Sequence, residues 1–188
     1  NSATAAAEGG ETATPPVREL RGWFPEAGSY VGRPRSSGAG GLGVAFKGGH
    51  NGEFHNHNDL GSFVVAVSGK VLIIDPGSEQ YTSRTFSSRR YESNLLNSYG
   101  HSVPIPAGVL QSEGIAARAP VVHYSFGEVN DVVTLDLAPA YEMVDLNRLE
   151  RTFVFSRAGS GRLTVRDEVD FCHPRTFGTA LVLSLIHI

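Results

Sequence analysis

The chain has 188 residues, of which 22 are glycine and only one is cysteine, and it carries a formal net charge of −3. This length suffices for one domain with a substantial core. The weak negative charge gives no electrostatic support for nucleic-acid binding or for attachment to an anionic membrane, so we expect no nucleic-acid partner and no membrane insertion. The single Cys172 excludes an intramolecular disulfide framework.

Both ends of the chain are interpreted as lying outside the domain. Residues 1–20 are predicted as a linker from a missing N-terminal domain, because "NSATAAAEGGETATPP" is rich in Ala, Thr, Gly and Pro. The last residues, "LSLIHI" (183–188), resemble the translation of a sequencing adaptor and are predicted as a non-native tail, with an ordinary strand as the alternative. We therefore interpret the chain as a fragment whose domain covers residues 21–182 and is truncated at its C-terminal end.

The segment between these ends has the pattern of β-structure. In chain order, "GSYVGRP", "GLGVAFKG", "GSFVVAVSG" and "KVLIIDPG" are runs of β-branched and aromatic residues punctuated by glycine and proline. Ser68 and Gly69 are predicted as the turn of a hairpin over 62–75. Later runs such as "LERTFVFSRAGSGRLTVRDEVDF" continue this pattern, and helical character is limited to a weak turn within 86–98. The sequence therefore predicts an all-β fold, an antiparallel sandwich or barrel.

The string "HNHND" at the entrance to this hairpin holds the main chemical signal. On an extended strand His55, His57 and Asp59 share one face, and two imidazoles with a carboxylate can bind a divalent metal or transfer protons. The hairpin returns Asp75 to its own entrance, and His101 begins the next strand. A His–Asp–His set suits zinc. Solvated histidines at a strand end are the alternative interpretation.

The H-x-H string also occurs in cupin barrels, where a glutamate ligand and a further histidine complete the site. Gly61 and Ser62 stand where that glutamate would be, and "SEQ" after "DPG" contains no histidine. A cupin-like metal-binding barrel is therefore an alternative that lacks two of its four ligands.

Five motifs in order carry a more specific resemblance: "HNHNDLGSF", "LIIDPG", "YTSRTFSSRRYE", "GHSVPIPAGVLQSEG" and "RLERTFVF". Together they resemble the C-terminal β-sandwich domain of the heparinase II/III-like polysaccharide lyases, a family that includes heparin/heparan and oligoalginate lyases. The resemblance runs from about Trp23 to Phe171. It implies a large antiparallel β-sandwich that packs against an α/α-toroid domain missing from this chain. It also implies a periplasmic or secreted bacterial enzyme and allows a homodimer.

The resemblance assigns roles to the histidines and to Asp75. It implies that His57, Asp75 and His101 bind a structural zinc ion (Zn²⁺) beside the cleft. His55 would face the cleft instead and help to hold or neutralise the carboxylate of the substrate. Two further motif residues, Asp59 and Gln111, would support the site by hydrogen bonding.

The same resemblance assigns tyrosine and arginine roles between "DPG" and "GHS". Tyr91 matches a tyrosine that takes part in proton transfer, and Tyr81 is the competing candidate because loops of this region vary in length. Arg89 and Arg90 would bind uronate carboxylates, with a solvated arginine pair as the alternative.

The implied reaction is β-elimination in an acidic, uronate-containing polysaccharide or oligosaccharide. A base removes the C5 proton and an acid protonates the leaving oxygen at C4, while the site stabilises the charge that develops on the carboxylate. We expect the fragment alone to be inactive, because half of the cleft would come from the missing domain. A sandwich that binds acidic glycans without cleaving them is the alternative function.

Overall fold

The computed structural model describes residues 19–35 and 41–186. The predicted all-β class is confirmed, since the described residues form strands and short 3₁₀ turns. The strands are β1 (Arg21–Phe24), β2 (Ser29–Gly32), β3 (Leu42–Phe46), β4 (Gly49–Asn51), β5 (Phe63–Val67), β6 (Lys70–Ile73), β7 (Pro104–Pro106), β8 (Gly114–Ala119), β9 (Val121–Phe126), β10 (Asn130–Asp136), β11 (Leu146–Ser156), β12 (Arg162–Phe171) and β13 (Phe177–Thr179). The 3₁₀ turns are η1 (Arg84–Phe86), η2 (Arg90–Glu92), η3 (Ser98–Gly100) and η4 (Ala138–Ala140). Within the part of the chain that the structure describes, no helix is long and apolar enough to cross a membrane.

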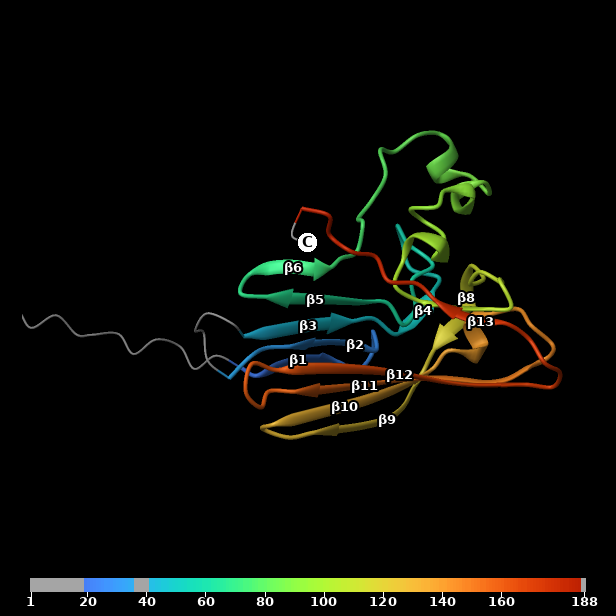
Figure 1. Cartoon of the computed structure of the whole chain (residues 1–188). Helices are drawn as coiled ribbons and strands as arrows, with labels where there is room; N and C mark the ends of the chain where they lie inside the picture. Colours follow the sequence, from blue (N-terminus) through green and yellow to red (C-terminus); the bar gives the residue numbers. More distant parts are fainter. Residues whose placement is uncertain (1–18, 36–40, 187–188) are drawn as a thin grey trace, which may run out of the picture.

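Two antiparallel sheets form the two layers of the molecule. The five-stranded sheet has the order β1-β2-β3-β5-β6, and the four-stranded sheet has the order β12-β11-β10-β9. The sheets lie one above the other, with the small pairs β4–β8 and β13–β7 at one end (Figure 1). These layers are separate open sheets rather than one closed barrel, so the architecture is the predicted sandwich and gives no support to the cupin-like alternative.

Aromatic side chains from both sheets fill the space between the layers. The ring of Phe153 on β11 stacks on Phe46 of β3, with 4.2 Å between ring centroids, and meets Phe63 of β5 edge-on at 5.9 Å. Tyr30 on β2 stacks on the same Phe46 ring at 4.7 Å. Burial of these large apolar surfaces is the main force that holds the two sheets together.

The only tryptophan lies where the edges of the two layers meet. Trp23 on β1 contacts Phe126 and Tyr124 of β9, with ring centroids 5.4 and 5.7 Å apart. Because β1 and β9 belong to different sheets, this aromatic cluster joins the layers at the side remote from β6.

The predicted hairpin of β5 and β6 is present. Ser68 and Gly69 both have positive φ angles, 52° and 79°, which is the geometry of a two-residue turn that matches the twist of the flanking strands. Residues 182–184 continue the sheet beyond β6, since Leu183 bridges to Ile73 and the Ser184 amide donates to the Leu72 carbonyl at 2.9 Å. Of the predicted terminal segments, residues 1–18 and 187–188 lie outside the described residues.

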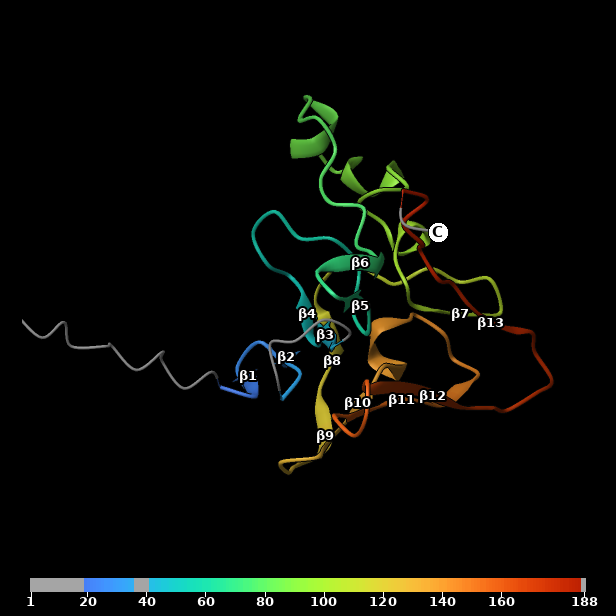
Figure 2. The same cartoon turned by 60° about the vertical axis from the view of Figure 1, so that its left-hand side comes forward.

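Residues 75–101 leave the five-stranded sheet after β6 and lead to β7, which pairs with β13. We call them the 75–101 segment. It contains three short 3₁₀ turns and stands above the five-stranded sheet in both views (Figure 1, Figure 2). The predicted weak turn within 86–98 corresponds to this region, which includes η2.

Candidate metal centre and adjoining cavity

The "HNHND" string forms a loop between β4 and β5, so the expectation of an extended strand there is wrong. His55 has a φ of 57°, in the left-handed region, which breaks the extended backbone. The loop also closes on itself through a hydrogen bond from the Asn56 amide to the Glu53 carbonyl. As a result His55 and His57 do not share a strand face, and their rings contact different neighbours.

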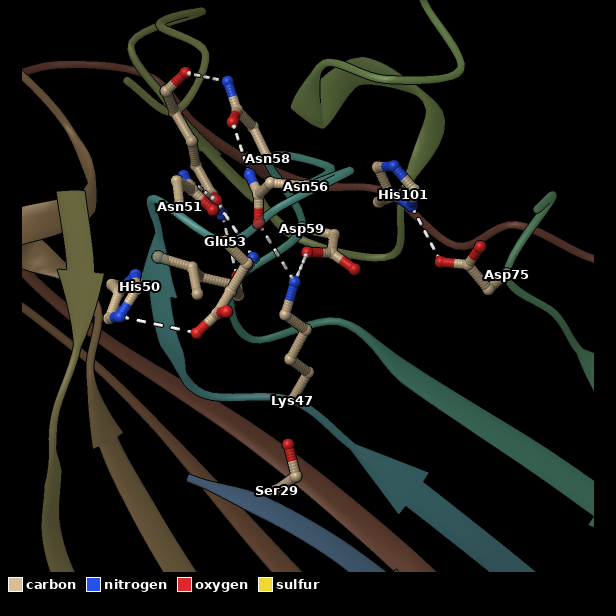
Figure 3. Close-up of polar contacts among 12 residues, drawn as sticks. Ser29, Lys47, His50, Asn51, Glu53, Asn56, Asn58, Asp59, Asp75 and His101 are labelled. Atoms are coloured by element: carbon tan, nitrogen blue, oxygen red, sulfur yellow. Dashed lines mark hydrogen bonds and ion pairs between the residues drawn. The ribbon is translucent and has the colours of Figure 1, made fainter. Parts of the chain in front are cut away.

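The two asparagines of the string hold this loop in place. Asn56 and Asn58 are buried and hydrogen-bond to each other, with 3.2 Å between Nδ2 and Oδ1 (Figure 3). The backbone N–H of Asn58 donates to the Leu96 carbonyl at 2.9 Å, and its side-chain Nδ2 donates to the Gln111 carbonyl. The histidines and asparagines of the string therefore have different roles. The buried asparagines hold the loop, and the histidines are more accessible, although the backbone is not a strand.

Asp59, the last residue of the "HNHND" loop, and Gln111 fix the C-terminal end of the loop. Asp59 forms an ion pair with Lys47 (Figure 3). The Gln111 side chain accepts from the Leu60 amide at 3.0 Å and donates to the Leu60 carbonyl at 2.7 Å. Asp59 thus ties the end of the loop to Lys47, and Gln111 holds the backbone of the next residue, which is the geometry expected of supporting residues.

His57 of the "HNHND" loop meets Asp75 and His101, which lie at the two ends of the 75–101 segment. One potential ligand atom from each lies within 4.8 Å of the others. Nδ1 of His101 is 2.9 Å from Oδ2 of Asp75 (Figure 3), and the His57 and His101 ring centroids are 5.3 Å apart. The expected meeting of these side chains is therefore present, while their role as metal ligands stays a prediction.

Local backbone chemistry delivers His101 into the interior. It follows η3, where the Asn97 side chain accepts the Tyr99 amide at 2.9 Å. A Cβ at Gly100 would lie 2.1 Å from the Asn94 carbonyl oxygen, so only glycine fits immediately before His101. The His101 ring is completely buried as a result.

The electrostatics favour the protonation states that a cation requires. Burial, together with the nearby His101, lowers the pKa of His57 and keeps its imidazole neutral. Burial opposes ionisation of Asp75, but hydrogen bonds from His101 and from the Gly77 amide outweigh it and lower the pKa of this carboxyl. Neutral imidazoles and an ionised carboxylate are the forms that bind metal ions.

The donor set also fits a borderline dication such as zinc. Two imidazoles and one carboxylate are common zinc ligands, and three protein ligands leave one position open. Among the described residues, Nε2 of His101 is buried without a hydrogen-bond partner. A buried polar atom of this kind is uncommon and is satisfied in structural sites by a ligand or an ion.

A cavity of about 330 Å³ adjoins the "HNHND" loop. It is lined by Glu53, Phe54, His55, Asn56, Thr85, Phe86, Ser87, Arg90 and Tyr91. The cavity thus joins His55 to two residues of the 75–101 segment that the sequence marked, Arg90 and Tyr91. Asn56, the residue before His57, lies in its wall and connects it to the metal centre.

His55 and Phe86 line this cavity, and Tyr81 beside them completes an exposed rim of three rings. The rings of His55 and Tyr81 stack with centroids 5.8 Å apart, and the tyrosine hydroxyl lies 3.3 Å from Nδ1 of His55. Phe86 meets both rings edge-on, at 5.3 Å from Tyr81 and 6.3 Å from His55. Phe86 is 65% exposed and was not marked by the sequence; its signal is an apolar ring within a polar, serine- and arginine-rich loop.

The tyrosine and arginine candidates occupy different positions. Tyr91 receives a hydrogen bond from Asn56 at 3.4 Å, and the Arg90 guanidinium lies 5.8 Å from its ring centroid. Arg90 donates to the Asn56 carbonyl at 2.8 and 3.1 Å and to Thr85, so it braces the loop. Arg89 does not line this cavity; it pairs with Glu92 on the surface at 2.8 Å.

Comparisons with known proteins agree with this architecture. No protein-family model matches the chain, and no curated protein sequence matches it. Among solved structures it is similar to the heparan sulfate lyase HepC from Pedobacter heparinus, with a TM-score of 0.67 and 18% identity over 88% of this chain and 24% of that one. A heparinase III structure gives a TM-score of 0.64 and 17% identity over 86% of this chain and 24% of that one. A heparinase III gene product gives a TM-score of 0.67 and 18% identity over 84% of this chain and 23% of that one.

The fold is therefore a large antiparallel β-sandwich similar to the one found in these lyase structures. More particularly, it is the fold of one part of the heparinase III-type lyases, and the resemblance found in the sequence is confirmed at this level. The chain spans about a quarter of the length of these structures.

Proposed function

We propose that this domain is the β-sandwich part of a polysaccharide lyase that cleaves uronate-containing acidic glycans by β-elimination. The observation that carries the proposal is the close placement of the His57–Asp75–His101 cluster and the cavity that holds His55 and Tyr91, on a fold shared with heparan sulfate lyases. An α/α-toroid domain would complete the cleft. An acidic polysaccharide substrate would place the enzyme in the periplasm or outside the cell, and a homodimer is compatible with this arrangement.

The metal, which we propose to be zinc, would have a structural role. When bound, it would supply a positive charge and a cross-link between the "HNHND" loop and both ends of the 75–101 segment. That segment carries Tyr81, Phe86 and Tyr91 on short 3₁₀ turns and connecting loops. The metal ligands would therefore fix the cavity wall rather than act on the substrate.

His55 is the proposed contact for the substrate carboxylate. Abstraction of the C5 proton places negative charge on that carboxylate, and a preorganised hydrogen-bond donor stabilises it. The left-handed φ of His55 is costly for a non-glycine residue, and such strain is often retained at functional sites. Arg90 contributes a fixed positive charge to the same wall, although its hydrogen bonds already go to the protein backbone.

Tyr91 is the proposed proton-transfer residue. Asn56 donates a hydrogen bond to its hydroxyl, and the Arg90 guanidinium lies 5.8 Å from its ring centroid, so the hydroxyl is held in the cavity wall where it can exchange a proton with the substrate. The base takes the proton from C5, a double bond forms between C4 and C5, and the C4–O bond breaks as its oxygen is protonated. Tyr81 is the second candidate because its hydroxyl lies beside His55.

The exposed rings provide a surface for the sugar itself. Phe86 lines the cavity and is 65% exposed, and Tyr81 beside it is 49% exposed and meets Phe86 edge-on. Exposed aromatic side chains at a concave site are typical of ligand-binding surfaces. Stacking of a uronate ring there would place its carboxylate near His55. Arg89 stands outside this cavity and would contact a more distant acidic group of a longer glycan.

Absorbance of the unsaturated uronate product tests the proposal. We expect heparan sulfate or alginate oligosaccharides to give this product with the protein of the complete open reading frame and not with the 188-residue chain alone. Turnover by the isolated chain would contradict the two-domain cleft. Glycan binding without product by the complete protein would favour the alternative, a non-catalytic glycan-binding sandwich.

A further inference from the structure

Arg151 is one of the large side chains buried in the interior, and it hydrogen-bonds to the backbone on both sides of the proposed metal centre. It belongs to β11 and its side chain is 1% exposed. Its Nε and Nη2 donate to the two carboxylate oxygens of Asp167, both at 2.7 Å, and Nη2 also donates to Thr179 at 2.8 Å. Its Nη1 donates to the carbonyls of Gly61 and Ser102, both at 2.9 Å. All five N–H groups of the guanidinium therefore have acceptors.

The sheet supplies the counter-charge for this buried cation. Asp167 on β12 is the direct cross-strand partner of Arg151 in the register of the two strands. A buried guanidinium is tolerated when it is paired and fully hydrogen-bonded, and the two parallel bonds to Asp167 meet that requirement. Asp167 thus fixes the position of the guanidinium relative to the four-stranded sheet and leaves its Nη1 free to donate to other groups.

The two carbonyl acceptors belong to the segments that carry the imidazoles. Gly61 lies four residues after His57, and Ser102 directly follows His101. A φ of 80° at Gly61, where a Cβ would lie 2.8 Å from Leu137, sets the direction of the first carbonyl. One nitrogen, Nη1, therefore bridges the two loops close to the histidines, whereas another bond between them, from the Asn58 backbone amide to the Leu96 carbonyl, lies farther from His101 along the chain.

We propose that Arg151, held by Asp167, is a positioning residue that sets the spacing of His57 and His101 for metal binding. The inference rests on the proposed metal role of these histidines. Residues that orient metal ligands contribute to affinity because a preformed ligand spacing avoids reorganisation on binding. Lysine cannot replace this arginine, since a single ammonium cannot reach Asp167 and both carbonyls in the same geometry.

A second buried pair in the molecule provides the matched control. Arg157 and Asp131 are 0% and 1% exposed, and the arginine also bonds to Tyr30 and to the carbonyls of Arg33 and Leu20. None of these groups belongs to a segment that carries a candidate metal ligand. Loss of this pair should destabilise the sandwich without acting on the metal centre.

The experiment compares Arg151→Lys and Asp167→Asn with Arg157→Lys in the 188-residue chain. Zn²⁺ affinity is measured by competition with a chelator, Co²⁺ coordination by its visible absorption spectrum, and thermal stability without metal. We expect all three variants to lower the melting temperature. Only Arg151→Lys and Asp167→Asn should weaken Zn²⁺ binding, by about tenfold or more, and change the Co²⁺ spectrum.

Three results would count against the inference. Wild-type Zn²⁺ affinity in folded Arg151→Lys would overturn it while leaving the metal role intact. Equal weakening by Arg157→Lys would show that general destabilisation is the cause. Failure of the wild-type chain to bind Zn²⁺ or Co²⁺ would remove the metal role and the inference with it. If Arg151→Lys does not fold, the milder Asp167→Asn decides the outcome.

Discussion

The sandwich and the 75–101 segment are held together in different ways. The sandwich has a continuous apolar core, in which Phe153 packs against rings of the opposite sheet. The 75–101 segment has one fully buried apolar side chain, Leu96, and is organised by polar contacts around Glu79, which accepts from Arg84, Thr85 and Ser93. A region held by few apolar contacts opens at low energetic cost, so the cavity wall depends on its ion pairs and on the ligand cluster at its two ends.

The largest effect is expected in the core. Phe153→Ala removes a completely buried ring between the sheets and should lower the free energy of unfolding by about 3–5 kcal/mol. Val154→Ala, on the other face of the same strand, should cost much less. Denaturant unfolding measures both values. Similar losses in the two variants would show that the rings are not the main contact between the layers.

The next effect concerns the ligand cluster. Zinc at about 100 times its dissociation constant should stabilise the wild-type chain by about 2.7 kcal/mol, and His57→Ala should abolish this increment. Hydrogen exchange should then become faster within residues 76–100 and stay unchanged in β10 and β11. His123→Ala, on β9, is the control that keeps the zinc-dependent increment. Zinc stabilisation of the His57 variant would refute the assigned ligand set.

A smaller effect follows from Glu79. Hydrogen bonds from Ser93, Arg84 and Thr85 lower the pKa of this carboxyl from 4.5 to about 2. A depressed folded-state pKa contributes stability above the ordinary value that is lost as the pH falls toward the folded value. Between about pH 4.5 and 2 the 75–101 segment should therefore loosen before the sandwich unfolds.

Pepsin cleavage within residues 76–100, followed by mass spectrometry, measures this loosening. Glu79→Gln should be cleaved faster than the wild type at pH 4.5, and the difference should vanish near pH 2. Glu92→Gln removes only one exposed pair with Arg89 and should behave like the wild type. A constant ratio between Glu79→Gln and wild type across this range would contradict the role of the ionised carboxylate.

The smallest effect on stability is expected at His55. His55→Ala should change the free energy of unfolding by less than about 1 kcal/mol, because the ring is exposed and the left-handed backbone disfavours both residues. Zinc content should be unchanged, while lyase activity of the complete protein should be lost. Loss of zinc from this variant would show that His55, and not only His57, contributes to the metal centre.

Much of this architecture was readable from local patterns. Short β-branched runs and the Ser68–Gly69 turn predicted the sandwich strands, because alternation and turn chemistry are encoded within a few residues. The convergence of Asp75 with His57 followed from the hairpin alone. The strand predicted for 55–59 was wrong because alternating burial arises there from two inward asparagines in a loop, and alternation does not reveal a positive φ.

Other features depend on contacts that no local pattern contains. Arg151 follows "LE" in a strand and has the appearance of an outward residue, yet its acceptors at Gly61 and Ser102 lie 90 and 49 residues away. Phe86 becomes part of a rim only because the 75–101 segment returns over His55. Such placements are set by tertiary packing and were accessible only from the structure.

The position of Trp23 has a practical consequence for optical work on this protein. As the sole indole, packed between β1 and β9, it should emit a signal that reports separation of the two sheets and stays silent when the 75–101 segment moves. Intrinsic fluorescence and a probe placed near Phe86 would then record two independent transitions in one sample. Comparison of the two signals would distinguish unfolding of the sandwich, reported by Trp23, from opening of the cavity wall, reported by the probe.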